Sequence, residues 1–159
     1  MALTVGCVGF APVSIAQPAT PRATSMAADA GVGDDDMPLA IETFQYPDSA
    51  KIAQEKGITL HKGDGHILLT DCAGTYDILV KARGPKNFCF AVKGKQGQLT
   101  LEVDNAFAIM TEDHPVHATI RVDGTETPID APKNGYKAFG EGDAKVNKPA
   151  VLLELRVTG

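Results

Sequence analysis

GDGHILLTDCAGTYDILVKARGPKNFCFAV, residues 63–92, contains three apolar runs, two turn signals and two cysteines. In the second and third runs, alternate apolar residues share one face, which is typical of half-buried strands. Glycine, proline and asparagine separate the runs, as expected of turns. The stretch therefore predicts three consecutive short strands: His66–Cys72, Tyr76–Ala82 and Phe88–Val92.

Outward from this stretch, the same alternation recurs on both sides. Short strands with a turn about every eight to twelve residues are typical of antiparallel sandwiches and barrels. We expect a mainly β fold, an antiparallel β-sandwich or barrel-like domain with one short helix. Further strands are predicted within Leu39–Tyr46 and at Ile58–His61, Leu99–Val103, Ala106–Met110, His117–Val122, Thr125–Ile129, Tyr136–Phe139 and Val151–Val157.

Two of these elements carry predictions in finer detail. The helix is expected over residues 50–56, with Asp48–Ser49 offering an N-cap and Gly57 ending it in a left-handed conformation. In the last strand, the alternation places the apolar side chains on the core side and two charged ones outside. The inward set is Val151, Leu153, Leu155 and Val157, and the outward set is Glu154 and Arg156.

Length and composition narrow the class of protein. The chain has 159 residues, enough for one domain with a real core. Its formal net charge is −5, and it has no dense cluster of lysine and arginine. Phosphate backbones are bound by concentrated positive faces, so we expect no nucleic-acid partner.

The N-terminal residues resemble an export signal. Residues 2–16 are uncharged and mostly apolar, and Ser14-Ile15-Ala16 offers the small residues that signal peptidase prefers, although no basic residue precedes the run. The run is too short to span a membrane core of about 30 Å. We predict a signal peptide at 1–16, a flexible leader at 17–36 and the β domain at 37–159, and hence an extracellular protein; the alternative is a tethered apolar tail.

Cys72 and Cys89 would be the only cysteines left after removal of the predicted signal peptide. Two lone cysteines in an exported domain usually form a disulfide, which we therefore predict. In a flat meander of three hairpin-linked strands, however, they would lie roughly 20 Å apart at about 3.3 Å per residue. The disulfide thus predicts that Ala73–Thr75 is not a tight hairpin, for example because the chain crosses between sheets there.

Two polar clusters are candidates for chemistry. His61, Asp64 and His66 surround a Gly-Asp-Gly turn and would suit a metal site or an acid/base pair, although Asp64 is also the residue type that bonds its own turn. His114 and His117 follow two acidic residues but lie beside a proline, without the helical face of a zinc motif. A surface loop is the better interpretation of the second cluster.

Signatures of common enzyme classes are missing from the sequence. There is no Gly-x-Ser-x-Gly elbow and no phosphate-binding Gly-Lys-Ser or Gly-Lys-Thr. The Gly63–Gly65 turn lacks the third glycine of a dinucleotide-binding loop. The sequence therefore implies no cofactor, and we expect an enzyme less than a non-catalytic protein.

Several turn and strand patterns resemble those of a group of short exported proteins of actinomycete bacteria. The similarity covers about residues 44–157 and implies secretion and the extent of the domain. It transfers no functional residue, because the group has no assigned activity. The patterns are Tyr46–Asp48, Gly57–Leu60, Lys62–Ile67, Phe88–Phe90 and Leu99–Val103.

Three functional hypotheses follow from these observations. The first is a secreted, non-catalytic module that binds a protein or cell-surface component through loops or a sheet edge, with no stable membrane span. The second is inhibition of an extracellular hydrolase by the loop at 82–87, and the third is a metal-dependent enzyme using the cluster around Asp64. The predicted binding-loop residues are Arg83, Lys86, Asn87, His114 and His117, in the loops 83–87 and 112–117, and a further contact loop is predicted at 133–148.

Overall fold

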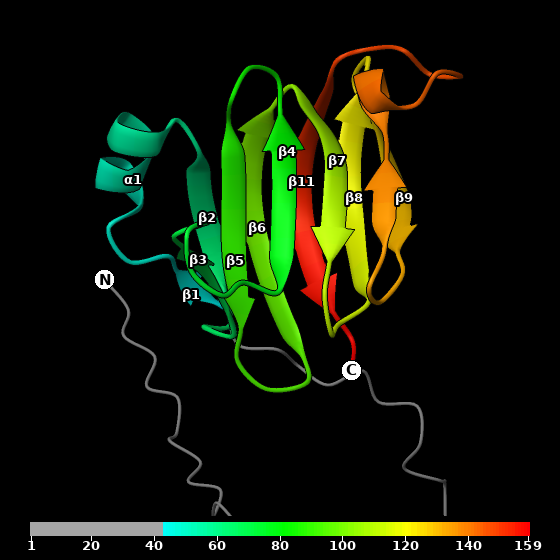
Figure 1. The fold of residues 1–159 in the computed structure, drawn as a ribbon. Helices are drawn as coiled ribbons and strands as arrows, with labels where there is room; N and C mark the ends of the chain where they lie inside the picture. Colours follow the sequence, from blue (N-terminus) through cyan, green and yellow to red (C-terminus); the bar gives the residue numbers. More distant parts are fainter. Residues whose placement is uncertain (1–42) are drawn as a thin grey trace, which may run out of the picture. The chain divides into compact units, whose positions relative to one another are not determined.

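Two antiparallel β-sheets lie against each other, and one short helix flanks them (Figure 1). This computed structural model describes residues 43–159, so the predicted signal peptide and leader lie outside the described residues. The six-stranded sheet has the order β1 (Phe44–Gln45), β2 (Thr59–Gly63), β6 (Gly97–Asp104), β11 (Ala150–Val157), β8 (Val116–Val122), β9 (Thr125–Ala131). The five-stranded sheet has the order β10 (Tyr136–Ala138), β7 (Ala106–Thr111), β4 (Ile78–Ala82), β5 (Asn87–Val92), β3 (Ile67–Thr70).

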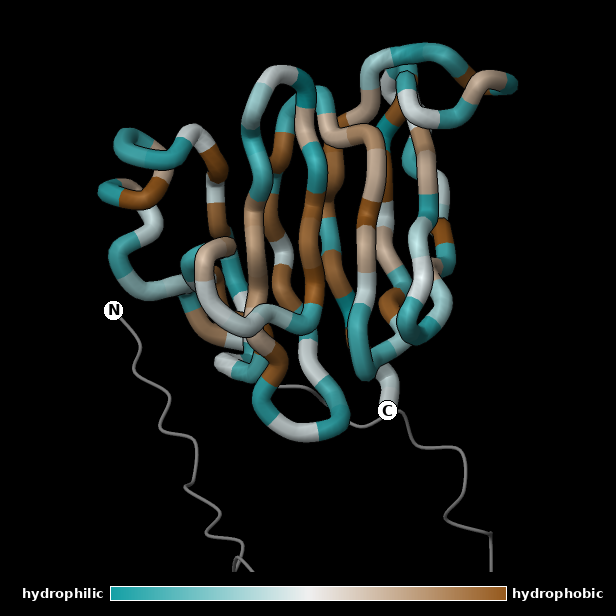
Figure 2. Tube along the Cα trace, in the orientation of Figure 1, coloured by the Kyte–Doolittle hydropathy of each residue, from teal (hydrophilic) through white to brown (hydrophobic). Residues whose placement is uncertain are grey.

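The core lies between the two sheets and confirms the predicted mainly β fold. Each sheet turns alternate apolar side chains inward, because successive residues of a strand point to opposite faces. Figure 2 shows hydrophobic residues along the strands and hydrophilic ones in most connections. The largest fully buried side chains are Phe90, Ile58, Leu60, Ile67, Ile78, Leu99, Leu101, Ile109, Leu152, Leu155, Val80 and Val103.

The three central strands do not form a meander. β5 pairs with β3 on one side, where Thr70 lies opposite Cys89, and with β4 on the other, where Leu79 lies opposite Cys89. β3 and β4 therefore run parallel, and residues 71–77 cross the outer face of β5 to join them. β3, β5 and β4 all belong to one sheet, so the chain does not cross between sheets at Ala73–Thr75, and the example of such a crossing is wrong.

A disulfide joins this crossover to β5, as predicted. Cys72 and Cys89 are bonded, with their Cα atoms 5.2 Å apart. Because β5 lies between β3 and β4, β3 pairs with β5 and Thr70 stands opposite Cys89. Cys72, two residues further on, is therefore close to Cys89, whereas a flat meander would hold the two cysteines far apart. The chain-entropy model predicts that closing such a loop stabilises a fold by about 3 kcal/mol.

The last strand corrects one prediction. The pairing of β11 shifts register between Leu152 and Glu154 against both neighbours, and against β8 Leu153 is the extra, bulged residue. A bulge resets which side chains face the core. Leu152 is consequently buried and Leu153 is half-buried, whereas the simple alternation predicts Leu153 inside. The same shift leaves Val151 half-buried, while Leu155 and Val157 are buried as predicted.

The helix α1 (Ser49–Lys56) ends as predicted but begins differently. Gly57 has φ 69° and donates its N–H to the Ala53 carbonyl at 3.0 Å, which closes the helix in a left-handed C-cap. Asp48 stands at the N-cap, but its φ is 53° and its side chain makes no capping hydrogen bond. The side-chain cap predicted at Asp48–Ser49 is therefore absent, although the Asp48 carbonyl accepts the N–H of Ile52, as the carbonyl of an N-cap residue does.

The exposed sheet edges are protected. The two-residue turn at Asp123–Gly124 makes Val122 and Thr125 a hydrogen-bonded pair, so by alternation the nitrogen of Pro128 faces away from β8. Because proline has no backbone N–H, the middle of β9 offers no hydrogen-bond donor on its outer side. On the other side, Tyr46 reaches β3, and its hydroxyl accepts the outward N–H of Leu69 at 2.8 Å.

Two lateral edges of the sandwich are used below and are named here. The closed edge is formed by β9 and β10, which contact each other, together with residues 139–149, including the short 3₁₀ turn η1 (Gly140–Gly142). The open edge is formed by β3, the end of β5 next to it, and α1. In Figure 1 the two edges lie on opposite sides of the sandwich.

Candidate functional site

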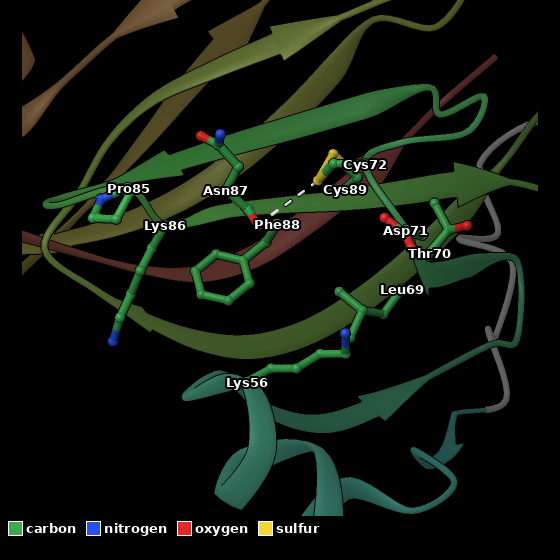
Figure 3. Close-up of a pocket in the computed structure, with 10 residues that line it drawn as sticks. All are labelled: Lys56, Leu69, Thr70, Asp71, Cys72, Pro85, Lys86, Asn87, Phe88 and Cys89. Atoms are coloured by element: carbon green, nitrogen blue, oxygen red, sulfur yellow. Dashed lines mark hydrogen bonds between the residues drawn. A yellow bond between two sulfur atoms is a disulfide. The ribbon is translucent and has the colours of Figure 1, made fainter.

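A hollow of about 390 Å³ lies at the open edge, between α1 and the turn that joins β4 to β5. We call it the edge hollow (Figure 3). Its walls come from three parts of the chain: the end of α1, the end of β3 with the crossover, and the first half of β5. The lining residues are Lys56, Leu69, Thr70, Asp71, Cys72, Pro85, Lys86, Asn87, Phe88 and Cys89.

The edge hollow exists because β3 is shorter than β5. β3 stops at Thr70, opposite Cys89, so Asn87 and Phe88 have no strand beside them on that side. Lys93 donates its N–H to the His66 carbonyl, and in the alternating ladder this makes Thr70–Cys89 a hydrogen-bonded pair. The N–H and C=O of Asn87 therefore face the side of β5 on which β3 is missing.

The floor of the hollow is apolar. Phe88 is 5% exposed and belongs to the core, and Leu69 packs against the core from β3. The disulfide forms one wall, where the Cys72 sulfur lies 3.7 Å from the Asn87 carbonyl oxygen. That contact is van der Waals in nature, since a disulfide sulfur carries no proton. The Asn87 N–H remains the polar backbone donor directed to the hollow.

Positive charge lies along the rim. Figure 3 shows Lys56 reaching from α1 toward Leu69, and Lys86 descending from the turn toward α1. A Cβ at Gly57 would lie 3.4 Å from the Lys86 ammonium, so this side chain extends to the C-terminal end of the helix. Across residues 43–159, none of the ion pairs includes Lys56 or Lys86.

Acceptor groups lie on the opposite wall. The carboxylate of Asp71 and the side chain of Thr70 stand across the hollow from Lys86 (Figure 3). One oxygen of Asp71, Oδ1, already accepts the N–H of Ala73 at 3.0 Å. The other oxygen of Asp71 has no hydrogen bond within the described part of the chain. The hollow thus has Lys86 and the Asn87 N–H at one end, acceptors at the other, and between them an apolar floor that Lys56 reaches from α1.

The predicted metal cluster does not assemble. Asp64 accepts the N–H of His66 at 3.0 Å and the N–H of Gln98 at 2.9 Å, so it bonds its own turn and a neighbouring strand. His66 Nδ1 lies 3.4 Å from Asp64 Oδ2, but His61 instead faces Glu102, at 3.9 Å. In the part of the chain that is described, no three His, Cys, Asp or Glu residues are arranged to hold a metal ion.

The predicted binding-loop residues do not share one surface. Lys86 and Asn87 line the edge hollow, while the guanidinium of Arg83 pairs with Glu141, with Nε donating to Oε2 at 3.1 Å. His117 contacts Asp130 on the exposed face of β8 and β9. His114 lies in the β7–β8 connection, does not line the edge hollow and belongs to no ion pair of the described residues. The hollow residues that the sequence does not predict include Lys56, Leu69, Asp71 and Phe88.

A second hollow, of about 280 Å³, lies on the outer face of the six-stranded sheet beside the bulge in β11. Its central carboxylate, Glu154, accepts Gln98 Nε2 at 2.6 Å and an Arg156 nitrogen at 2.9 Å. Arg121 in the same hollow is paired with Glu126 at 2.8 Å. These charged groups bond one another, which distinguishes this hollow from the edge hollow.

No protein-family model matches the chain, and no curated protein matches it either. Among solved structures, an antifungal protein from Streptomyces tendae Tu901 is similar over 58% of this chain and 99% of its own length. The sequence identity is 17% and the TM-score is 0.43. This similarity is too distant to carry an argument about function. No helix among residues 43–159 has the length and apolar character needed to cross a membrane.

Proposed function

We propose that the chain is a secreted, non-catalytic binding module that holds a partly apolar anion in the edge hollow. The observation that carries the proposal is the pair of lysines without ion pairs, Lys56 and Lys86, above an apolar floor. An anionic group placed there gains charge-assisted hydrogen bonds, and its apolar part covers Phe88. A partner protein or cell-surface component would present such a group.

Secretion is supported by two features of the chain. The disulfide between Cys72 and Cys89 is of the kind that persists in oxidising compartments. The N-terminal residues have the apolar run and small residues of an export signal.

The edges of the sheets are poorer places for a partner. A strand added to β9 would meet Pro128, which has no N–H, and one added to β3 would compete with the Tyr46 hydroxyl for Leu69. β10 has three residues and β1 has two, so each presents a short ladder. The hollow is therefore favoured over strand addition.

Hexanoate and hexylammonium make a matched pair of probes for this proposal. We expect millimolar hexanoate to shift the NMR amide signals of Leu69, Asn87 and Phe88, and hexylammonium to leave them unchanged. Lys86→Met should weaken hexanoate binding about tenfold, because one charge-assisted hydrogen bond is lost. Lys51→Met, on the same helix as Lys56 but paired with Glu55, is the control and should bind normally. Equal shifts with both probes, or shifts with neither, would contradict the proposal.

The two alternatives have less support. A hydrolase inhibitor using residues 82–87 would need an available anchor, but the Arg83 guanidinium is held by Glu141. A metal-dependent enzyme would need His61 near Asp64 and His66, whereas His61 faces Glu102.

A further inference from the structure

We infer that the edge hollow recognises the free carboxyl end of a peptide whose last side chain is apolar. The inference rests on the proposed function and names the ligand of the same site. It follows from the order of polar groups around the hollow: Lys86 and the Asn87 N–H at one end, an apolar floor with the Lys56 ammonium beside Leu69, and the Asp71 carboxylate at the other end (Figure 3).

The terminal carboxylate lies at the donor end. It accepts hydrogen bonds from the Asn87 N–H and from Lys86, with Lys56 adding positive charge from the helix side. The Asn87 N–H faces the hollow because β3 ends before it. A backbone donor beside lysines is the arrangement by which proteins hold terminal carboxylates.

The apolar side chain lies on the floor. Phe88 and Leu69 line the hollow between its two polar ends, and the disulfide bounds the space on one side (Figure 3). The volume of about 390 Å³ accommodates one amino-acid residue with its flanking groups. Side chains with a charge would be desolvated there without a partner and are disfavoured.

The amide of the terminal residue distinguishes a peptide from a simple fatty acid. Asp71 keeps one oxygen free of hydrogen bonds among the described residues, and it faces the hollow opposite Lys86. A peptide N–H donates to that oxygen, whereas a fatty acid offers only methylene groups there. A fatty acid would also leave the Asp71 carboxylate partly desolvated, at a cost in free energy.

N-acetyl-leucine is the simplest probe with all three features. With the full-length chain, isothermal titration calorimetry should give a Kd of about 1 mM, as expected for a ligand of this size. N-acetyl-leucinamide, which lacks the carboxylate, should bind about tenfold more weakly. N-acetyl-N-methyl-leucine, which lacks the amide proton, should also bind about tenfold more weakly than N-acetyl-leucine.

Asp71→Asn separates the inference from the proposed function. The Asn side-chain oxygen can still accept the Ala73 N–H, but its NH₂ replaces the free acceptor. N-acetyl-leucine should lose about tenfold in affinity, while hexanoate should bind at least as tightly because a negative charge is removed. If hexanoate and N-acetyl-leucine bind with equal affinity both to the native protein and to Asp71→Asn, the peptide inference is wrong and the proposed function stands. If neither probe binds, both are wrong.

Discussion

Each lateral edge of the sandwich must shield the core from solvent at the side where the two sheets separate. The closed edge and the open edge do this in different ways. At the closed edge, Ile120, Ile129 and Phe139 line a smaller hollow of about 210 Å³. Its charged lining residues, Lys137 and Asp143, belong to no ion pair among the described residues. At the open edge, a shorter strand leaves a larger hollow whose lysines have no ion pair among the described residues. Unpaired charges are therefore common to both edges, and the open edge differs in its larger hollow and in the N–H of Asn87, which has no strand beside it.

The largest expected effect separates stability from binding. Phe139→Ala removes a side chain that is 3% exposed at the closed edge, and Phe88→Ala removes one that is 5% exposed at the open edge. Each should lower the free energy of unfolding by about 3 kcal/mol in urea titrations. Only Phe88→Ala should abolish hexanoate binding. Loss of binding in both variants would remove the distinction between the two edges.

The disulfide is expected to matter next most. Replacing Cys72 and Cys89 together by alanine frees the crossover and should cost about 3 kcal/mol, with a fall in Tm of about 10 °C. Thermal unfolding with and without reductant measures this, and reductant should affect only the native chain. An unchanged Tm in the double variant would show that pairing within the sheet holds the open edge without the disulfide.

Tyr46→Phe tests the protection of the open edge. The change removes the hydroxyl that accepts the Leu69 N–H and should cost about 1 kcal/mol, because that donor returns to water. Tyr136→Phe is the matched control at the closed edge, where Tyr136 is 54% exposed, and it should change stability by less than about 0.5 kcal/mol. Equal effects in denaturant titrations would assign Tyr46 no special role.

The smallest effects on stability are expected from the rim charges. Lys56→Met should leave the free energy of unfolding within about 0.5 kcal/mol of the native value but weaken hexanoate binding. Arg83→Met breaks an exposed ion pair with Glu141 and should cost less than about 1 kcal/mol, with binding unchanged. A large loss of stability in Lys56→Met would mean that this lysine supports the helix instead of a ligand.

Much of the fold follows from local patterns in the sequence. Strands appear where apolar residues alternate, and Gly57 ends the helix because its left-handed backbone suits glycine. The conflict between the two cysteines and a flat meander also predicts that Ala73–Thr75 is not a hairpin. The face of β11 is mispredicted at Leu153, because a bulge depends on pairing with neighbouring strands and leaves no mark in the alternation.

The site is less accessible to sequence reasoning. Lys56 ends a helix and Lys86 lies in a turn, and no spacing rule relates two lysines so far apart. They meet only because β3 stops at Thr70 and leaves room beside β5. Asp64 and His66 are close in sequence and in space, but the third expected ligand, His61, belongs to a strand that turns it toward Glu102.

The place of β5 between two strands that precede it bears on the order in which the chain folds. A polypeptide synthesised from its N-terminus presents β3 and β4 before residues 87–92 exist. These two strands cannot bond each other in their final positions, so a gap one strand wide stays between them until β5 arrives. Insertion of β5 then joins three neighbouring strands, β4, β5 and β3, and brings Cys89 to Cys72. Oxidation of this pair would therefore report, in pulse-labelling experiments, the moment at which β5 inserts between β3 and β4.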